Sequence, residues 1–383
     1  MSPVRPKSVG STTLGEVLGA GGMAEVVLGV QEPLERKVAV KALLPELKED
    51  PEATERFRRE ALALAALQHE NIIAVHDLLE KFGRTYLVME YVDGVTLETI
   101  LRAGPLPIDI ALLVGAGVAA ALEHAHFRRV IHRDIKPGNV MLSRSGQVKL
   151  TDFGIAKDLT QDDLTRKGLV IGTPRYLSPE QASGQRADAR SDIFSLGVLL
   201  YQMLSGQLPH SGQNTAELLI AIARGQRKRL REIAPRLPKS VVRVVERCLE
   251  VDPARRYQGA AELRRDLEHL LAAILKGSAA ARLVAFLKER GQISEDSLTL
   301  IASEEVAAAS PITSPETVLK FSTPIGPTPR PRLRRLSRWL LMVIFSLLLV
   351  AGGTVAVGVF APNWTRATLA TIATWLAPTQ DGG

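Results

Sequence analysis

The sequence predicts an α+β protein with two unequal lobes, a small one built mainly of β-sheet and a larger helical one. Three observations support this. Residues 12–92 alternate apolar and polar side chains, which is typical of strands. Residues 93–276 instead repeat apolar side chains at helical spacing. The charged stretch "IHRDIKPGNV" at 131–140 interrupts the helical part, because Pro137 and Gly138 prevent a regular helix there.

The small lobe follows an N-terminal tail at 1–11. Residues 12–30 predict a strand, a tight glycine-rich turn and a second strand, and 36–43 predict a third strand. The segment after residue 50 has a helical stripe of apolar residues, namely Phe57, Ala61, Leu64 and Leu67. Two more strands are expected in "NIIAVHDLLE" and "RTYLVMEYV", which completes a sheet with one helix over 12–92.

The larger lobe spans 93–276, with helices expected at 108–127, 191–205, 214–224, 239–250 and 259–275. The run "ALLVGAGVAAAL" at 111–122 is too short to cross a membrane, so it predicts a core helix. Cys248 is the single cysteine of the chain, which excludes an internal disulfide framework and suits a reducing compartment. It lies in a helical pattern and is expected to be a small buried side chain.

The remainder predicts a membrane anchor. Residues 277–329 form a Ser/Thr/Pro-rich linker, within which "ARLVAFLKER" has helical spacing. The basic segment 330–338 carries five arginines, and 339–361 lacks charge and is long enough to span a hydrocarbon layer of ~30 Å. Because positive residues favour the inner side, we expect a single-pass protein of the plasma or inner membrane, with residues 1–338 cytoplasmic and the tail 362–383 outside.

The net charge of +7 raises the question of a nucleic-acid partner. The arginines of 330–338 are better explained by the predicted span, and the basic cluster at 224–232 lacks interleaved aromatic residues. No nucleic-acid partner is therefore expected.

Two sets of residues predict phosphate chemistry. Gly19, Gly21 and Gly22 lie between two strands, so they favour a flexible hairpin over phosphates rather than a dinucleotide-binding fold. Lys41 lies on an apolar strand and needs an acidic partner, for which Glu60 is the best candidate.

The charged loop and the later "VKLTDFGIAK" complete this chemistry. Asp134 and Asp152 lie on two turns joined by a short hairpin, which brings them close. With the amide oxygen of Asn139 they form an oxygen-rich pocket suited to Mg²⁺, while Lys136 can neutralise a transferred phosphoryl group.

In this order and spacing the motifs resemble those of eukaryotic-like (Hanks-type) bacterial serine/threonine protein kinases, over roughly residues 12–272. The motifs are "GAGGMAEV", "VAVK", the Glu in "RFRREA", "MEYV", "HRDIKPGN", "DFG", "GTPRYLSPE", "DARSDIFSLG" and "DPARRY". The resemblance implies the bilobal protein-kinase fold and an ATP- and Mg²⁺-dependent enzyme, with Mn²⁺ as an alternative ion.

The resemblance also implies roles for individual residues. Asp134 would accept the substrate proton, with Lys136 beside the γ-phosphate, and Asn139 and Asp152 would hold the metal. Lys41, paired with Glu60, would hold the α- and β-phosphates. The remaining ATP-binding positions would be Leu18, Gly19, Ala20, Gly21, Gly22, Met23, Val26, Ala39, Met89 as gatekeeper, Glu90, Val92 and Met141.

Further residues would support or regulate the site. Asp192 would brace the catalytic loop, Arg256 would pair with Glu180, and Thr173 would reach toward Asp134 and Lys136. His132 is expected to be structural. Arg133, next to Asp134, implies an activation loop ordered by phosphate, with Thr165 as the main autophosphorylation site and Thr160 as a second.

Three positions depart from the pattern of the family. Ala24 replaces a glycine of the phosphate loop, Ser178 replaces the Ala of an "APE" element, and Gly138 stands where a larger residue is common. None of them removes a reacting group.

The expected function is phosphorylation of Ser/Thr in protein substrates, with self-association for autophosphorylation between molecules at a membrane. The alternative is a pseudokinase scaffold that binds nucleotide and partners without catalysis. Retention of Lys41, Glu60, Asp134, Asn139 and Asp152 argues against it.

Overall fold

A computed structural model describes residues 7–21, 24–47, 50–81, 83–153 and 174–293. Residues 1–6 of the predicted tail 1–11, the linker from residue 294, the basic segment, the span 339–361 and the tail 362–383 lie outside the described residues, whereas Ser8–Val9 of the predicted tail form a strand. So do Gly22, Met23, Thr160, Thr165 and Thr173.

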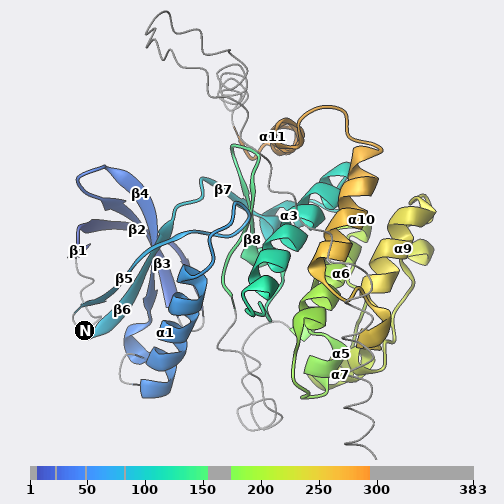
Figure 1. Cartoon of the computed structure of the whole chain (residues 1–383), viewed down its shortest axis with the longest axis horizontal. Helices are drawn as coiled ribbons and strands as arrows, with labels where there is room; N and C mark the ends of the chain where they lie inside the picture. The colour runs from blue at the N-terminus through green and yellow to red at the C-terminus, as the bar shows by residue number, and fades with distance from the viewer. Residues whose placement is uncertain (1–6, 22–23, 48–49, 82, 154–173, 294–383) are drawn as a thin grey trace, which may run out of the picture. The chain divides into compact units, whose positions relative to one another are not determined.

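The smaller lobe is a six-stranded antiparallel sheet with one long helix, α1 (Pro51–Ala65), against it (Figure 1). The strand order is β1-β2-β3-β4-β6-β5. Asp50 caps α1 by accepting hydrogen bonds from the amides of Glu52 and Ala53, and Pro51 begins the helix. The strands are β1 (Ser8–Val9), β2 (Thr12–Ala20), β3 (Ala24–Gln31), β4 (Arg36–Leu43), β5 (Val75–Lys81) and β6 (Arg84–Glu90).

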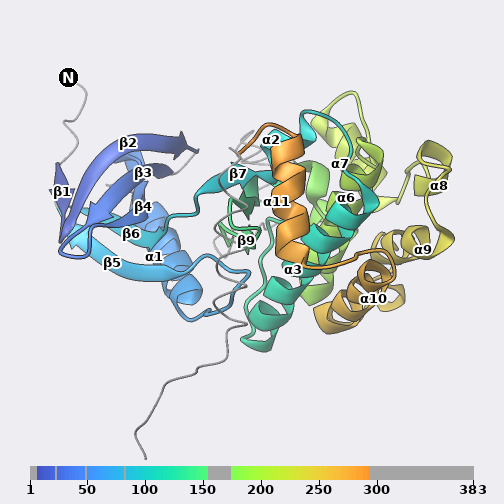
Figure 2. The same ribbon diagram turned by 90° about the horizontal axis from the view of Figure 1, so that it is seen from above.

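The larger lobe is helical and carries a small three-stranded sheet where it faces the smaller lobe (Figures 1 and 2). That sheet has the order β7-β8-β9, with β7 (Gly94–Thr96), β8 (Val140–Ser143) and β9 (Val148–Leu150). The helices are α2 (Leu97–Leu101), α3 (Ile108–Phe127), α5 (Pro179–Ala182), α6 (Ala189–Ser205), α7 (Thr215–Ala223), α8 (Leu230–Ile233), α9 (Lys239–Cys248), α10 (Ala260–Ala272) and α11 (Ala279–Glu289).

Helices α3 and α6 form the centre of this lobe. Almost every residue of α6 from Ser191 to Leu204 is buried, and twelve residues of α3 are buried. Within the described residues, α3 is the one helix long and apolar enough to cross a membrane, and 67% of its most apolar window is buried. The run 111–122 is therefore a core helix, as predicted. Cys248 is fully buried, and burial raises the pKa of its thiol.

The folded part of the chain extends beyond residue 276, where the sequence predicts a linker. Helix α11 buries Leu283, Val284, Phe286 and Leu287 against the larger lobe, each at most 1% exposed. The helical spacing of "ARLVAFLKER" therefore corresponds to a helix of the folded lobe, although the Ser/Thr/Pro-rich composition of 277–329 as a whole predicts a linker there.

Candidate active site

Lys41 joins the two lobes. Strand β4 places its Nζ 2.8 Å from Glu60 Oε1 on α1 and 2.9 Å from Asp152 Oδ1, which is 111 residues away in the sequence. Burial acts to lower the pKa of Lys41, but the two carboxylates outweigh burial and raise it above its usual value. Burial acts to raise the pKa of Asp152, and Lys41 outweighs it, so the net shift is downward. Both groups are held in their charged forms.

The loop between α3 and β8 holds Asp134 by two neighbours. Lys136 Nζ donates to Asp134 Oδ2 over 2.8 Å. The side-chain amide of Asn139 donates to the Asp134 carbonyl oxygen over 2.8 Å and to its Oδ2 over 3.1 Å. Pro137 starts the single 3₁₀ turn that carries Asn139 back toward Asp134. The three side chains therefore form one hydrogen-bonded group.

The β8–β9 hairpin brings Thr151, the neighbour of Asp152, onto the backbone of Asn139. Thr151 donates its backbone N–H to the carbonyl oxygen of Asn139 over 2.9 Å and its hydroxyl to the same oxygen over 3.3 Å. Asp152 has a left-handed backbone, with φ of 52°. This conformation is uncommon for a non-glycine residue and typical of functional turns.

The donor set at this hairpin fits a hard cation shared with a nucleotide. Asp152 supplies a carboxylate, and the Asn139 amide directs its nitrogen to Asp134, which leaves its oxygen for a cation. In the described part of the chain no three His, Cys, Asp or Glu side chains are grouped to hold a metal. Mg²⁺ usually keeps waters and shares one or two carboxylates with phosphate oxygens, so two protein donors are sufficient only when a nucleotide is bound.

Asp192 supports the loop from within the core. This fully buried carboxylate accepts hydrogen bonds from the backbone amides of His132 and Arg133, both at 2.8 Å. It also lies 2.8 Å from His126 Nε2. Arg133 has a left-handed backbone, with φ of 63°, and such a conformation costs about 1–3 kcal/mol unless its surroundings impose it. The bonds from Asp192 supply that constraint.

His132 is structural, in agreement with the sequence interpretation. Its Nε2 lies 3.0 Å from the Thr151 carbonyl, its Nδ1 accepts the Asp134 amide over 3.2 Å, and its ring contacts Phe153 at 4.4 Å between centroids. A neutral ring with its hydrogen on Nε2 satisfies both polar contacts. Burial lowers the pKa of His132, so the neutral form is retained.

We expect Asp192→Asn to reduce turnover while nucleotide binding is preserved. The amide places an N–H₂ where one carboxylate oxygen accepts, so one of the two loop amides loses its partner and Arg133 relaxes. A fall in kcat of about tenfold or more, with a Kd for nucleotide within about twofold, follows from a displaced Asp134. Steady-state kinetics and calorimetric titration measure the two quantities. Unchanged kcat would show that Asp192 has no part in aligning the loop.

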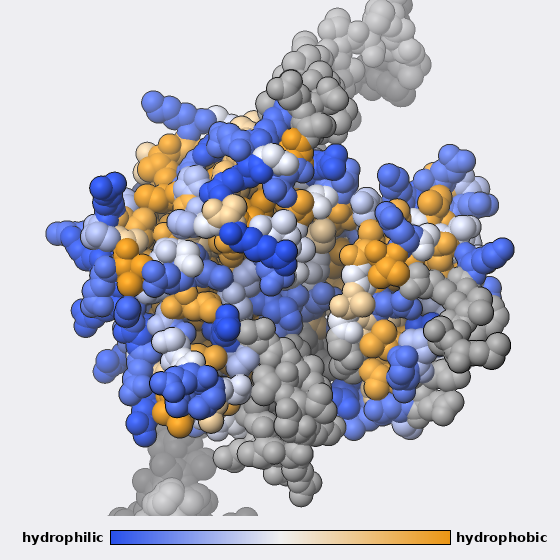
Figure 3. All heavy atoms as spheres, turned by 180° about the vertical axis from the view of Figure 1, so that it is seen from behind, coloured by the Kyte–Doolittle hydropathy of each residue, from blue (hydrophilic) through white to orange (hydrophobic). Residues whose placement is uncertain are grey.

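The predicted adenine-binding residues lie on adjoining strands. Ala39 of β4 pairs with Met89 of β6, and Met141 of β8 pairs with Thr96 of β7. Ala39, Met89 and Val92 are buried, and Val26 and Met141 are partly buried against the same apolar cluster. In Figure 3 the surface is hollowed between the two lobes.

The described part of the phosphate hairpin is more open. Leu18 is 42% exposed, and Gly19 and Ala20 are exposed. A Cβ at Gly19 would meet nothing within 4 Å, and Gly21 donates its amide to the Ala24 carbonyl over 2.8 Å. Crowding in this structure therefore does not explain Gly19.

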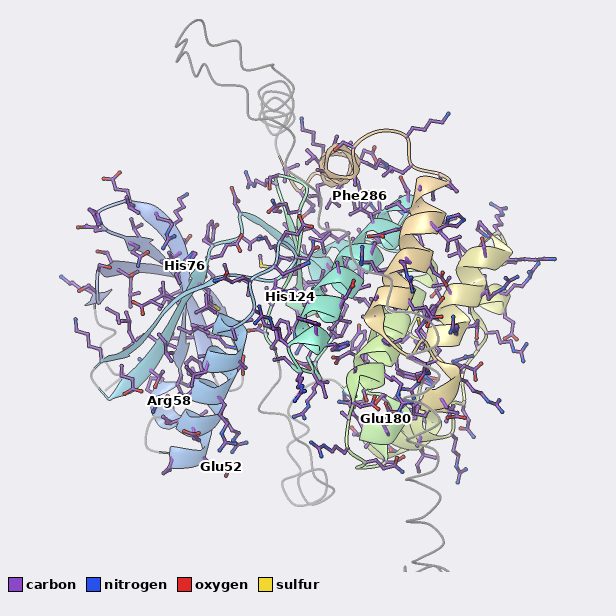
Figure 4. The ribbon with its side chains drawn as sticks, in the orientation of Figure 1. Glu52, Arg58, His76, His124, Glu180 and Phe286 are labelled. Atoms are coloured by element: carbon purple, nitrogen blue, oxygen red, sulfur yellow. The ribbon has the colours of Figure 1, made fainter. Side chains whose placement is uncertain are left out.

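Glu180 and Arg256 form a buried bidentate ion pair, as anticipated. Arg256 Nη1 and Nη2 lie 2.8 Å from the two carboxylate oxygens of Glu180, and Arg256 is 1% exposed. Burial acts to raise the pKa of Glu180, but Arg256 outweighs it and the pKa is lowered. Figure 4 shows Glu180 at the end of the larger lobe opposite to Phe286.

Some site contacts could not be read from the sequence. Glu90 forms an ion pair with Lys149 at 2.8 Å and accepts a hydrogen bond from the Ala74 amide, so its side chain connects β6 to β9. Ser178, noted as a mild departure, caps α5 in a reciprocal capping box with Gln181. The sequence signal for this capping box was the Ser–Pro–Glu–Gln order, which is typical of a helix start.

A groove of about 380 Å³ opens beside the catalytic loop. Lys136 and Gly138 line one side, and α2 lines another with Glu98 and Arg102. Tyr176, whose hydroxyl donates to Gln202 over 2.6 Å, closes a third side. An extended segment in this groove would lie next to the Lys136–Asp134 pair.

These features define a class of site. A lysine held by two carboxylates, and an aspartate with a lysine and an asparagine on one turn, are suited to binding phosphates and positioning a hydroxyl. Such a site belongs to a phosphoryl-transferring enzyme.

Comparison with known proteins gives the family. The family model for the protein kinase domain matches residues 12–267. The serine/threonine-protein kinase PrkC of Bacillus subtilis is 34% identical over 354 residues, which cover 90% of this chain and 52% of PrkC. The serine/threonine-protein kinase PknB of Mycolicibacterium smegmatis is 38% identical over 368 residues, covering 91% of this chain and 55% of PknB. The chain belongs to the protein kinase family.

The structural likeness agrees. A crystal structure of the PknI kinase domain of Mycobacterium tuberculosis superposes with a TM-score of 0.56 at 29% identity, covering 71% of this chain and all of that domain. The chain spans about half the length of the two curated relatives named above.

Proposed function

We propose that this protein kinase transfers the γ-phosphoryl group of ATP to Ser and Thr hydroxyls of proteins, with Mg²⁺ or Mn²⁺ as the metal. The observation that carries the proposal is the bridge from Lys41 to Glu60 and Asp152, which joins the lobes at 2.8 and 2.9 Å. Phosphoryl transfer needs positioned charges rather than covalent work by the protein, and this bridge places a cation where phosphates and a metal would meet.

The chain's own residues divide the work. Lys41 would bind phosphate oxygens, and Asn139 and Asp152 would hold the metal, which supplies charge neutralisation when bound. Asp134, held by Lys136 and Asn139, would orient the substrate hydroxyl and take its proton. The groove beside Lys136 would hold the protein segment that carries this hydroxyl. Names of relatives as serine/threonine-protein kinases support the choice of Ser and Thr over Tyr.

The test is to incubate the full chain with γ-labelled ATP and a generic acceptor protein, with Mg²⁺ and with a chelator. We expect label on Ser and Thr in Mg²⁺ alone, identified by phosphoamino-acid analysis. Nucleotide binding without any label would favour the scaffold alternative. Label on Tyr would contradict the proposed specificity.

Regulation by the activation loop is part of the proposal. Arg133 sits next to Asp134, and phosphate on Thr165, or secondarily on Thr160, would order the loop through charge pairing with a cation of this kind. Thr173 would then reach toward Asp134 and Lys136. Phosphopeptide mapping of the labelled chain that finds neither Thr160 nor Thr165 modified in active enzyme would refute this.

We also propose single-pass anchoring by 339–361, with the kinase domain cytoplasmic, 362–383 outside, and self-association at the membrane for autophosphorylation between molecules. The uncharged length of 339–361 and the five arginines before it support this. Deletion of 339–361 should move the chain from the membrane fraction to the supernatant. If the deleted form stays with the membranes, another segment is the anchor.

A further inference from the structure

Helix α11 follows residues 12–267, which the kinase family model matches. It is nevertheless firmly attached to the larger lobe. Its four buried apolar residues face the lobe, and Figure 2 shows it lying across α3. Figure 4 shows Phe286 at the end of the larger lobe opposite to Glu180.

Polar contacts fix both ends of α11. Near its start, the carbonyl of Ala280 lies so close to Gly146 of the β8–β9 turn that a side chain at Gly146 would collide with it. Arg282 Nε donates to Asp109 Oδ2 over 2.6 Å, at the beginning of α3. At the other end is Arg290, the residue that follows α11.

Arg290 contacts the connection between α2 and α3. Its Nη1 donates to the Ala103 carbonyl over 3.2 Å and its Nη2 to the Pro105 carbonyl over 3.0 Å. Its guanidinium lies over the ring of Phe286, 5.3 Å from the centroid, and this ring is 1% exposed. The planar guanidinium, held against the ring, can donate to two carbonyl oxygens at once from a fixed geometry. A lysine ammonium is a single point charge and lacks this arrangement of donors.

The α2–α3 connection that Arg290 contacts adjoins one wall of the groove, the wall formed by Glu98 and Arg102. Residues 102–107 join α2 to α3. Glu98 of α2 and Arg102, the first residue of the connection, line the groove beside Lys136. The connection is also attached to α6, because the Leu106 amide donates to the Met203 carbonyl over 2.7 Å. Helix α2 is itself anchored by its buried Leu97 and Ile100, and these attachments hold the connection that follows it.

We propose that Arg290 is a positioning residue for the protein substrate, because it holds the α2–α3 connection and thereby the Glu98–Arg102 wall of the groove. This rests on the proposed function, in which a protein segment occupies the groove. A wall held in one position loses less entropy when a substrate binds, so its loosening raises the KM for that substrate. The nucleotide contacts none of these residues in the proposal.

The test compares Arg290→Ala with wild type in the full chain. We expect the KM for a peptide acceptor to rise by about threefold to tenfold, as the loss of one or two modest hydrogen bonds predicts, with kcat and the KM for ATP within about twofold. Arg290→Lys should lie between the two. Hydrogen exchange at the amides of Ala103, Gly104 and Leu106 should accelerate by a similar factor, while that of Leu150 should not change.

Arg282→Ala is the matched control, because it removes a contact of α11 with α3 and none with the connection. It should lower Tm without changing the KM for peptide. The proposal is overturned if Arg290→Ala leaves the KM for peptide and the exchange at 103–106 unchanged, or if Arg282→Ala raises that KM equally. If wild type phosphorylates no peptide, the proposed function fails, and the exchange experiment alone decides whether Arg290 holds the connection.

Discussion

Asp134→Asn is expected to lower kcat by about 10²–10⁴-fold, the usual contribution of a positioned general base. The amide cannot take a proton from the substrate hydroxyl at neutral pH. Its oxygen can still accept from Lys136 or Asn139, which hold the carboxylate at 2.8 and 3.1 Å in the wild type. The loop should therefore keep its shape, and the loss should fall on chemistry. Single-turnover kinetics at saturating ATP and Mg²⁺ measure the effect.

Two further measurements separate this effect from a damaged site. The Kd for ATP and the Tm of Asp134→Asn should match those of wild type, since the ion pairs of Lys41 with Glu60 and Asp152 are untouched. Lys41→Met should instead weaken nucleotide binding, because it removes the cation from both carboxylates. Wild-type turnover in Asp134→Asn would exclude Asp134 as the base.

Arg256→Met is expected to lower the free energy of unfolding by about 3–5 kcal/mol, because it leaves Glu180 as an unpaired buried charge. Arg256 also donates to the carbonyls of Arg190, Glu250 and Val251, at 3.0, 2.7 and 3.0 Å. The double variant Arg256→Met/Glu180→Leu should be no less stable than Arg256→Met, since the stranded charge is gone. Chemical denaturation measures all three proteins.

The same pair predicts a pH dependence with a definite sign. The folded-state pKa of Glu180 is lowered, so its contribution to stability is present above the unfolded pKa of about 4.3 and is lost as the pH falls through the folded value. In Glu180→Gln, the free energy of unfolding should lack this part of its decrease at acid pH. Parallel acid unfolding curves for wild type and Glu180→Gln would contradict the assignment.

Much of the fold and the candidate site could be predicted from local patterns. The switch from period two to helical spacing located both lobes, and the apolar neighbours of Lys41 required an acidic partner, which the structure supplies as Glu60. The short hairpin after the charged loop predicted that Asp134 and Asp152 lie near each other, and the structure places Thr151, next to Asp152, on the Asn139 carbonyl. The core position of α3 followed from its length and its polar continuation.

Contacts between distant segments could not be predicted in this way. Lys149 pairs with Glu90 across 59 residues, and no periodicity marks either residue as a partner. The carbonyls that receive Arg290 lie more than 180 residues earlier, so the helical spacing of "ARLVAFLKER" could indicate a helix but not the surface on which it packs. For Asp192 the family resemblance implied a bracing role, and the structure adds the two backbone amides from which it accepts, those of His132 and Arg133.

The apolar face of α11 has a practical consequence for recombinant work. Burial of a large aliphatic or aromatic side chain is worth about 1.5–3 kcal/mol, and four such residues of α11 are covered. A polypeptide truncated at residue 276 would lose this helix and expose the apolar surface of α3 that it covers to solvent, which promotes aggregation. Protein made for crystallisation or screening should therefore continue to residue 293, and the shorter version should be harder to keep monodisperse.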